Sequence, residues 1–158
     1  MRIAPRTSAR RALSAVACVA MLAALTSCDR STIGPSELRI GDCFDVPEGT
    51  SSFSALRRIP CEGPHSGEVF HIFAAALAVG ATYPTDQEWG TVIYPVCDPR
   101  FDEWTGTQIE TSTSVRYRFL VPTKEEWDRG NRQVTCFLSR TDGTKLEGSL
   151  RATARPSS

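Results

Sequence analysis

The side chains best suited to chemistry lie close together from Cys61 onward, where a thiol, two imidazoles and two carboxylates occur within a short stretch. The thiol of Cys61 and the imidazoles of His65 and His71 are ligand types that zinc accepts. A cysteine in a disulfide supplies no thiolate, however, so we expect no metal site and no cofactor. The same requirement for a free thiolate argues against a Cys–His hydrolase.

Catalysis by an oxygen nucleophile or by paired acids has little support in the sequence. Ser66 and His65 are neighbours, but the chain has no Gly-x-Ser-x-Gly motif that would expose a serine nucleophile. General acid and base work by paired carboxylates stays open as an alternative, with the candidates Asp42, Asp45, Glu62 and Glu68, although acids in turns act more often as caps. We therefore predict that the protein is not an enzyme.

The turn Pro64–Glu68 allows two interpretations. In the first, His65 and Glu68 form a rigid polar patch beside a disulfide and contact a partner, and the histidine responds to mild acid. In the second, His65 hydrogen-bonds within its own turn, and the proline and glycine only set backbone angles. The sequence favours the second interpretation, and His65 and Glu68 are the candidate partner contacts under the first.

The N-terminus has the features of a bacterial lipoprotein signal. A basic start without acids precedes an apolar run over residues 12–25, which is too short and too rich in alanine for a membrane-spanning helix. Leu25–Cys28 resembles a lipobox, in which the cysteine thiol accepts a diacylglycerol before cleavage. We expect removal of residues 1–27 and a lipid anchor at Cys28, acylated by a fatty acid such as palmitate. An ordinary secretory peptide and an uncleaved anchor are the alternatives.

Four cysteines remain after Cys18 of the signal and Cys28 are set aside. An even set in an oxidising compartment predicts two disulfides. Three pairings are possible. We favour Cys43–Cys61, which closes a short N-terminal loop, and Cys97–Cys136, which ties a predicted helix to a predicted late strand.

The charge balance argues against a nucleic-acid partner. The whole chain has 18 basic and 18 acidic residues. Removal of residues 1–27 takes away four arginines, so the remaining chain is mildly acidic. No Lys/Arg cluster persists in it, and no segment interleaves aromatic with basic residues, so we expect no nucleic acid as partner. Its length suits one domain with one core.

Two capping boxes, each a threonine followed three residues later by glutamate, mark the predicted helices. The first helix should begin at Asp86 and end at Gly106. Pro95 and Pro99 lie inside it, so we expect a kink or two short helices. The second helix is predicted over Lys124–Arg129.

Alternating or β-branched apolar residues between turn signals predict the strands. They are Leu38–Ile40, Leu56–Pro60, Glu68–Ala74, Ser114–Val121, Gln133–Ser139 and Lys145–Leu150. The last two are expected to form a hairpin. The predicted fold class is α+β: a small, mainly antiparallel sheet with helices on one side, pinned by two disulfides.

The same signals divide the chain into four parts. Residues 1–27 form the signal peptide, and residues 28–37 are polar, contain Gly34-Pro35 and read as a lipid-anchored tether. The α+β domain covers residues 38–151. Residues 152–158 read as a flexible tail.

Short motifs spread over nearly the whole predicted domain carry a family resemblance. They are Gly41–Phe44, Cys61–Val69, Tyr83–Pro84, Cys97–Asp98, Pro122–Thr123, Trp127, Gly130, Arg132, Val134, Cys136 and Gly148–Leu150. The chain thereby resembles the septum-formation-related domain of actinobacterial envelope proteins. The resemblance implies an exported or membrane-anchored module with a link to cell division, and it supplies no catalytic residues. The chain departs from the family in Pro95 and in its lipoprotein anchor, because many relatives use a transmembrane helix.

Together these features predict a noncatalytic interaction module, lipid-anchored to the outer face of the cytoplasmic membrane. Its expected partners are the membrane, through the lipid, and an envelope or division protein. The adjacent Arg10 and Arg11 allow twin-arginine export, and general secretion is equally compatible. The alternative is an envelope enzyme or a small-ligand-binding lipoprotein, which a deep pocket gathering His65 and Glu68 would support.

Overall fold

The computed structural model describes residues 32–46, 53–78 and 80–152. The predicted signal peptide, Cys28 and residues 153–158 of the predicted tail lie outside the described residues. A six-stranded antiparallel sheet with the order β1-β3-β2-β4-β6-β5 carries the fold. Its strands are β1 (Thr32–Ile33), β2 (Cys43–Asp45), β3 (Leu56–Ile59), β4 (Gly67–Ala74), β5 (Val115–Leu120) and β6 (Gln133–Arg140).

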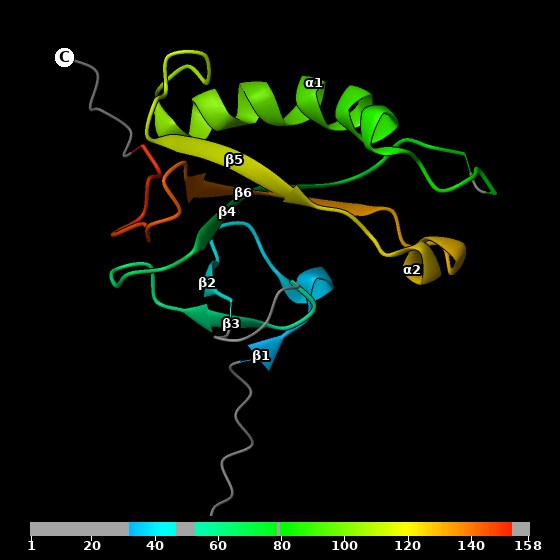
Figure 1. Cartoon of the computed structure of the whole chain (residues 1–158), viewed down its shortest axis with the longest axis horizontal. Coiled ribbons are helices and arrows are strands. Elements are labelled where there is room, and N and C mark those ends of the chain that lie inside the picture. Colours follow the sequence, from blue (N-terminus) through cyan, green and yellow to red (C-terminus); the bar gives the residue numbers. More distant parts are fainter. Residues whose placement is uncertain (1–31, 47–52, 79, 153–158) are drawn as a thin grey trace, which may run out of the picture.

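The sheet is curled, and α1 (Asp86–Thr105) lies along the outer face of β4, β6 and β5, whereas β2, β3 and β1 curve away on the other side (Figure 1). One apolar cluster fills the space between the sheet and α1, with Phe70 and Leu138 among its members. A second cluster, which includes Phe44 and Phe137, fills the concave side of the curl. The α+β class and the antiparallel sheet are confirmed.

Helix α1 runs without interruption through Pro95 and Pro99, so of the two expected outcomes, a kink or two short helices, the second was wrong. The two prolines are four residues apart and both are exposed, so the carbonyl groups that lose their donors face solvent rather than the core. The opposite face of α1 is buried against the sheet, and this burial stabilises the helix. Side chains at a spacing of four residues pack against the sheet there: Trp89, Ile93, Cys97 and Phe101.

The helix ends follow the sequence signals closely. Thr85 and Glu88 form the reciprocal capping box of α1, and Gly106 ends the helix in the left-handed region with φ 68°. Thr123 and Glu126 cap α2 (Lys124–Asp128) in the same way. Each box pairs two N-terminal amide donors that a helix otherwise leaves unsatisfied. Among the described residues, no helix is both long and apolar enough to cross a membrane.

The N-terminal elements differ from the prediction. Thr32–Ile33 pairs with β3, the 3-10 helix η1 (Pro35–Glu37) follows, and Ile33 packs in the concave cluster. The predicted tether therefore joins the domain from Thr32 onward. The strand expected at Leu38–Ile40 is instead a turn that Asp42 closes by accepting a hydrogen bond from the amide of Arg39 at 2.8 Å.

The return strand expected at Lys145–Leu150 is absent from the described residues, where a single bridge joins Leu146 to His65. Gly148 adopts φ 71°, a left-handed conformation that interrupts an extended ladder. The amide of Leu150 donates to the side chain of Glu68 instead of to a neighbouring strand. The segment is thus held by side chains rather than by strand pairing.

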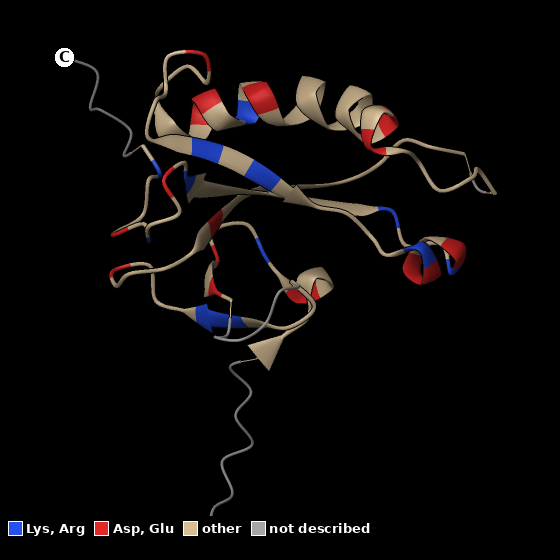
Figure 2. Cartoon of the chain, viewed as in Figure 1, with Lys and Arg blue, Asp and Glu red and all other residues tan. Residues whose placement is uncertain are grey.

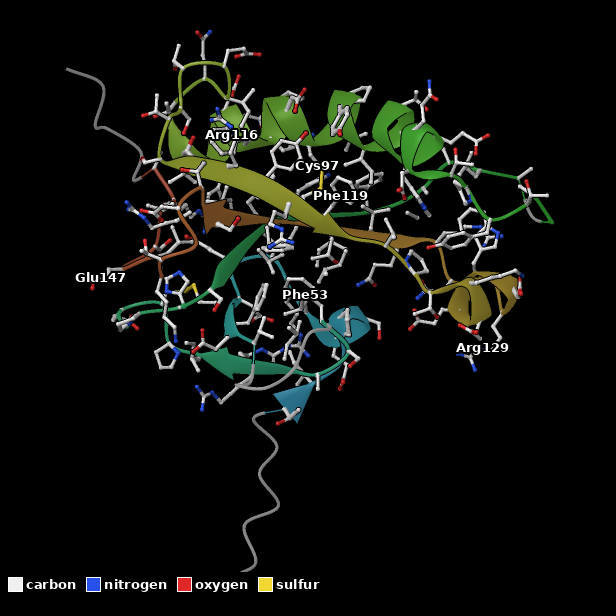
Figure 3. The ribbon with its side chains drawn as sticks, in the orientation of Figure 1. Phe53, Cys97, Arg116, Phe119, Arg129 and Glu147 are labelled. Atoms are coloured by element: carbon white, nitrogen blue, oxygen red, sulfur yellow. A yellow bond between two sulfur atoms is a disulfide. The ribbon has the colours of Figure 1, made fainter. Side chains whose placement is uncertain are left out.

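Both predicted disulfides are confirmed. Cys43–Cys61 links β2 to the turn after β3, and Cys97–Cys136 links α1 to β6. The second bridge lies between the helix and the sheet, where Cys97 is labelled (Figure 3). It therefore fixes the position of α1 on the sheet.

Candidate functional site

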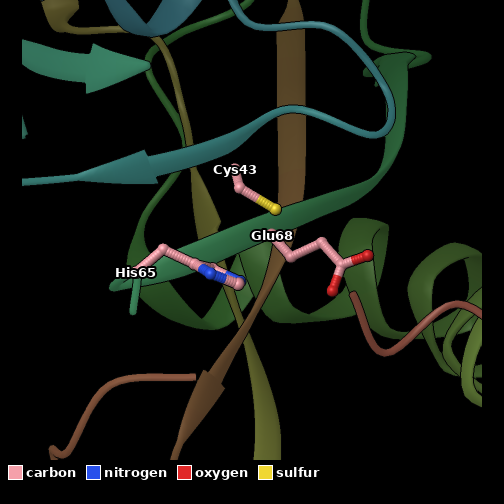
Figure 4. A group of neighbouring side chains, drawn as sticks. All are labelled: Cys43, His65 and Glu68. Carbon is pink, nitrogen blue, oxygen red and sulfur yellow. The ribbon is translucent and has the colours of Figure 1, made fainter. Parts of the chain in front are cut away.

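His65 and Glu68 lie close together but inside the protein (Figure 4). Their exposed fractions are 0% and 1%. An interior position excludes the exposed contact patch of the first interpretation, so that prediction was wrong. The backbone of His65 pairs with Leu146 on both its amide and its carbonyl, at 3.0 and 2.8 Å, and this draws the C-terminal residues over the turn.

The carboxylate of Glu68 accepts three hydrogen bonds. The donors are Nε1 of Trp104 at 3.1 Å, the hydroxyl of Ser149, and the amide of Leu150 at 2.7 Å. A buried carboxylate requires such compensation because burial removes its water. Glu68 thereby joins β4, α1 and the C-terminal residues.

The imidazole of His65 has one polar contact among the described residues. Its Nδ1 lies 2.8 Å from the carbonyl oxygen of Gly63, which agrees with the second interpretation of the turn. Its buried Nε2 has no hydrogen-bond partner in the described part of the chain. A nitrogen of His65, a carboxylate oxygen of Glu68 and the Sγ of Cys43 lie within 4.8 Å of one another. Because Cys43 is oxidised, this group supplies no thiolate ligand.

The sequence offered three ligand types, Cys61, His65 and His71, and the described structure does not bring them together. The one group of possible metal ligands found there combines His65 with Cys43 and Glu68. His71 stacks on Phe73 at 5.8 Å between ring centroids. Partial burial, followed by the nearby charge of Arg100, lowers the pKa of His71 below its ordinary value.

The C-terminal segment, Lys145–Ala152, is an integral part of the domain. Lys145 Nζ contacts Asp45 Oδ2 at 2.5 Å, and the amide of Ala152 donates to the carbonyl of Trp104 at 2.6 Å. Between Lys145 and Ala152, the segment pairs with the backbone of His65 and donates hydrogen bonds to the carboxylate of Glu68. Sequence reasoning assigned this segment to a hairpin and missed its side-chain attachments, for which the sequence gives no signal beyond the Gly148–Leu150 motif.

Asp45 is the second buried carboxylate, 3% exposed. It accepts hydrogen bonds from Lys145, from the hydroxyl of Ser66 at 2.6 Å and from Arg57 at 3.3 Å. Burial alone would raise the pKa of Asp45, but the hydrogen bonds from Lys145 and Ser66 and the charge of Lys145 together hold it below its ordinary value. The folded state thus favours the ionised form.

Replacing Asp45 by Asn should lower the free energy of unfolding at pH 7 by about 1.5–3 kcal/mol, the usual value of hydrogen bonds to a charged group. Because the folded pKa lies below the unfolded value of about 3.9, the stabilisation is complete above pH of about 4 and is lost as pH falls through the folded pKa. Urea unfolding between pH 7 and pH 2 measures both effects. Asp128→Asn, at an exposed carboxylate, is the control. Equal pH profiles for Asp45→Asn and the unsubstituted chain would contradict the assignment.

A pocket of about 550 Å³, here named the arginine pocket, opens between β5, the end of β6 and residues beside β2 and β3. Its described lining comprises Val46, Phe53, Ser66, Arg116, Arg118, Phe137, Ser139, Arg140, Thr141, Gly143 and Thr144. Figure 2 shows the two basic positions of β5 as blue bands on that strand. Sequence reasoning missed this pocket, although the alternation of arginine with apolar residues along β5 was visible.

Comparison with known proteins yields one match. A family model described as septum formation matches residues 40–156, well over half of the chain. No curated protein and no solved structure matches the chain. The matched range contains both disulfides, the C-terminal segment and the arginine pocket.

Proposed function

Because the chain belongs to the septum formation family, we propose that it is a noncatalytic, lipid-anchored interaction module that serves septum formation from the outer face of the cytoplasmic membrane. Cys28 carries the lipid, and the folded domain meets an envelope or division protein. The family match supports the link to septum formation or cell division. The lipobox in the sequence supports the anchor. The interaction role is supported by the reactive side chains, which stabilise the fold.

The observation that carries the proposal is that the most reactive side chains in the described structure hold the fold together. Four cysteines form two disulfides. The carboxylate of Glu68 is filled by three donors, and His65 is buried beneath the C-terminal segment. Side chains used in this way fix the domain's shape, which suits a scaffold that presents a surface to a partner.

The position of the first strand supports anchoring at Cys28. Strand β1 begins at Thr32 and pairs with β3, so three residues separate Cys28 from the folded domain. Three extended residues reach about 10 Å at most. A lipid at Cys28 would therefore hold the domain at the membrane surface, where a septal membrane protein is accessible.

The decisive experiment replaces Cys28 by Ala in cells depleted of the native protein. We expect alkyne-palmitate to label the unsubstituted chain but not Cys28→Ala, because the acylated thiol is missing. Depletion should lengthen the distance between septa. Cys28→Ala should restore the normal distance at most partially, because the domain is no longer held by lipid. Gel fluorescence and microscopy of membrane-stained cells measure the two effects.

Cys18→Ala is the matched control, since Cys18 lies in the apolar run outside the lipobox. This variant should be labelled and should restore septum spacing like the unsubstituted chain. Labelling of Cys28→Ala would refute the anchor. Normal septum spacing after depletion would refute the role in division.

A further inference from the structure

The arginine pocket has the composition of an anion site. Three guanidinium groups line it, from Arg116, Arg118 and Arg140, and its described lining contains no carboxylate. Arg140 forms an ion pair with Asp142 at 3.4 Å. The lining residue Ser66 donates its hydroxyl to the carboxylate of Asp45 at 2.6 Å, and that carboxylate is already paired with Lys145 and Arg57. The local excess of positive charge in a chain without net charge needs an explanation beyond solubility.

Arg118 is oriented by an aromatic floor. Its guanidinium carbon lies 5.3 Å from the centroid of the Phe53 ring, a cation–π arrangement. Phe53 lies on the concave side of the sheet, below β5 in the view of Figure 3. Phe53 in turn packs against the buried Phe137 at 5.8 Å between centroids. A guanidinium placed over a ring interacts through its charge, and its five N–H groups can still donate to an anion.

Arg116 and Ser139 extend the donor set along the same part of the sheet. Arg116 is two residues from Arg118 on β5, so both side chains leave the same face of the strand. Ser139 is the partner of Arg116 on β6 in the strand register. The guanidinium of Arg116 is steadied by a hydrogen bond from Nη1 to the carbonyl of Ser112. Among the described residues, neither Arg116 nor Arg118 forms an ion pair with a carboxylate.

We propose that the arginine pocket binds a phosphodiester group, with Arg118 as the main contact and Arg116 and Ser139 beside it. Guanidinium forks match the oxygens of phosphates and carboxylates. The two non-bridging oxygens of a phosphodiester share one negative charge and are set on a tetrahedral phosphorus, so donors from two neighbouring arginines can each reach one of them. The apolar floor of Phe53 and Phe137 strengthens these contacts by excluding water.

The phosphodiester site is additional to the proposed function and does not depend on the lipid anchor. A phosphodiester at the membrane surface has two sources, a phospholipid headgroup and a soluble polymer of the envelope. Both present the same group to the pocket, so the probe must distinguish them.

The test uses the full chain in nonionic detergent micelles. Glycerophosphoglycerol is the soluble probe, and micelles doped with phosphatidylglycerol supply the lipid-borne group, with micelles doped with diacylglycerol, which has no phosphate, as the reference. Guanidinium ¹⁵N–¹H NMR reports on the arginine side chains directly, and calorimetry gives the affinity. We expect saturable binding with shifts at Arg118 and Arg116, and Arg118→Gln should weaken it by about tenfold or more.

Arg129→Gln is the matched control, because it removes the same charge from an exposed arginine at the end of α2, away from the pocket (Figure 3). It should bind like the unsubstituted chain. The double variant Arg116→Lys/Arg118→Lys should bind more weakly than the unsubstituted chain, because lysine keeps the charge but loses the fork. An unchanged thermal unfolding midpoint confirms that these exposed positions leave the fold intact.

Pocket-dependent binding of glycerophosphoglycerol supports the proposal with a soluble source, and pocket-dependent binding of phosphatidylglycerol micelles alone supports it with a lipid source. Three results would overturn it. They are the absence of saturable binding, equal weakening by Arg129→Gln and Arg118→Gln, and equal affinity for acetate or citrate.

Discussion

Replacing both Cys97 and Cys136 by Ala should lower the free energy of unfolding by about 4 kcal/mol. The bridge spans 39 residues, and the entropy that a crosslink of this length removes from the unfolded chain corresponds to that value. Both cysteines are 0% exposed and sit between α1 and the sheet, so the loss also leaves a gap in the core. Because a domain of this size has about 5–15 kcal/mol in total, a loss of this size is a large share of the stability.

Guanidinium chloride unfolding of the oxidised protein measures this effect. The variant Cys43→Ala/Cys61→Ala provides the comparison, since its bridge spans 18 residues and should be worth about 3 kcal/mol. It should also leave α1 in place, because neither cysteine contacts the helix through a disulfide. A larger loss for this second variant than for the first would contradict the argument from loop length and core position.

Replacing Glu68 by Ala should lower the free energy of unfolding by about 2–4 kcal/mol. The substitution leaves the indole N–H of Trp104 and the amide of Leu150 without their acceptor. Both residues are half-buried, so each donor costs towards the lower end of the about 1–3 kcal/mol of a buried unsatisfied group. Glu68→Gln keeps one acceptor oxygen and should lose less. The measurement is urea unfolding, combined with hydrogen exchange of the Leu150 amide, which should become faster in Glu68→Ala.

Glu147→Ala is the control, because it removes an exposed acid from the same C-terminal segment (Figure 3). Its stability and the exchange rate of the Leu150 amide should stay close to those of the unsubstituted chain. If Glu68→Ala left the exchange rate at Leu150 unchanged, the C-terminal segment would be held by other contacts and the role assigned to Glu68 would fail.

Local signals predicted the elements that depend on local physics. The capping boxes at Thr85 and Thr123 located both helix starts because the capping hydrogen bonds join residues three positions apart. The alternation of polar and apolar residues over Val115–Leu120 located β5, because successive side chains of a strand point to opposite faces of the sheet. The disulfide pairing also followed from the elements that each bridge was expected to join.

The errors occur where tertiary contacts outweigh local preference. Pro95 and Pro99 disfavour a helix by themselves, but a buried face and a disulfide hold α1 together. The polar composition of the predicted tether did not reveal that Ile33 would be buried in the concave cluster. In both cases the deciding partner is far away in the sequence.

For the functional residues, the sequence likewise showed their chemistry but not their burial or their neighbours. The sequence singled out His65 and Glu68 as chemically able, but their burial depends on the C-terminal segment about 80 residues later. The arginine pocket is assembled from strands that pair across the sheet and from Phe53, which lies far from Arg118 in the chain. Only the folded sheet brings these side chains onto one surface.

The order of the cysteines along the chain bears on how the protein matures. The first two described cysteines pair with each other, and so do the last two, so the bridges are neither nested nor interleaved. In a chain that emerges from a membrane pore N-terminus first, each of these four cysteines is followed by its native partner before any other of the four appears. An oxidising enzyme that joins thiols in order of arrival would make the correct bonds, and maturation would not need an isomerase to rearrange them.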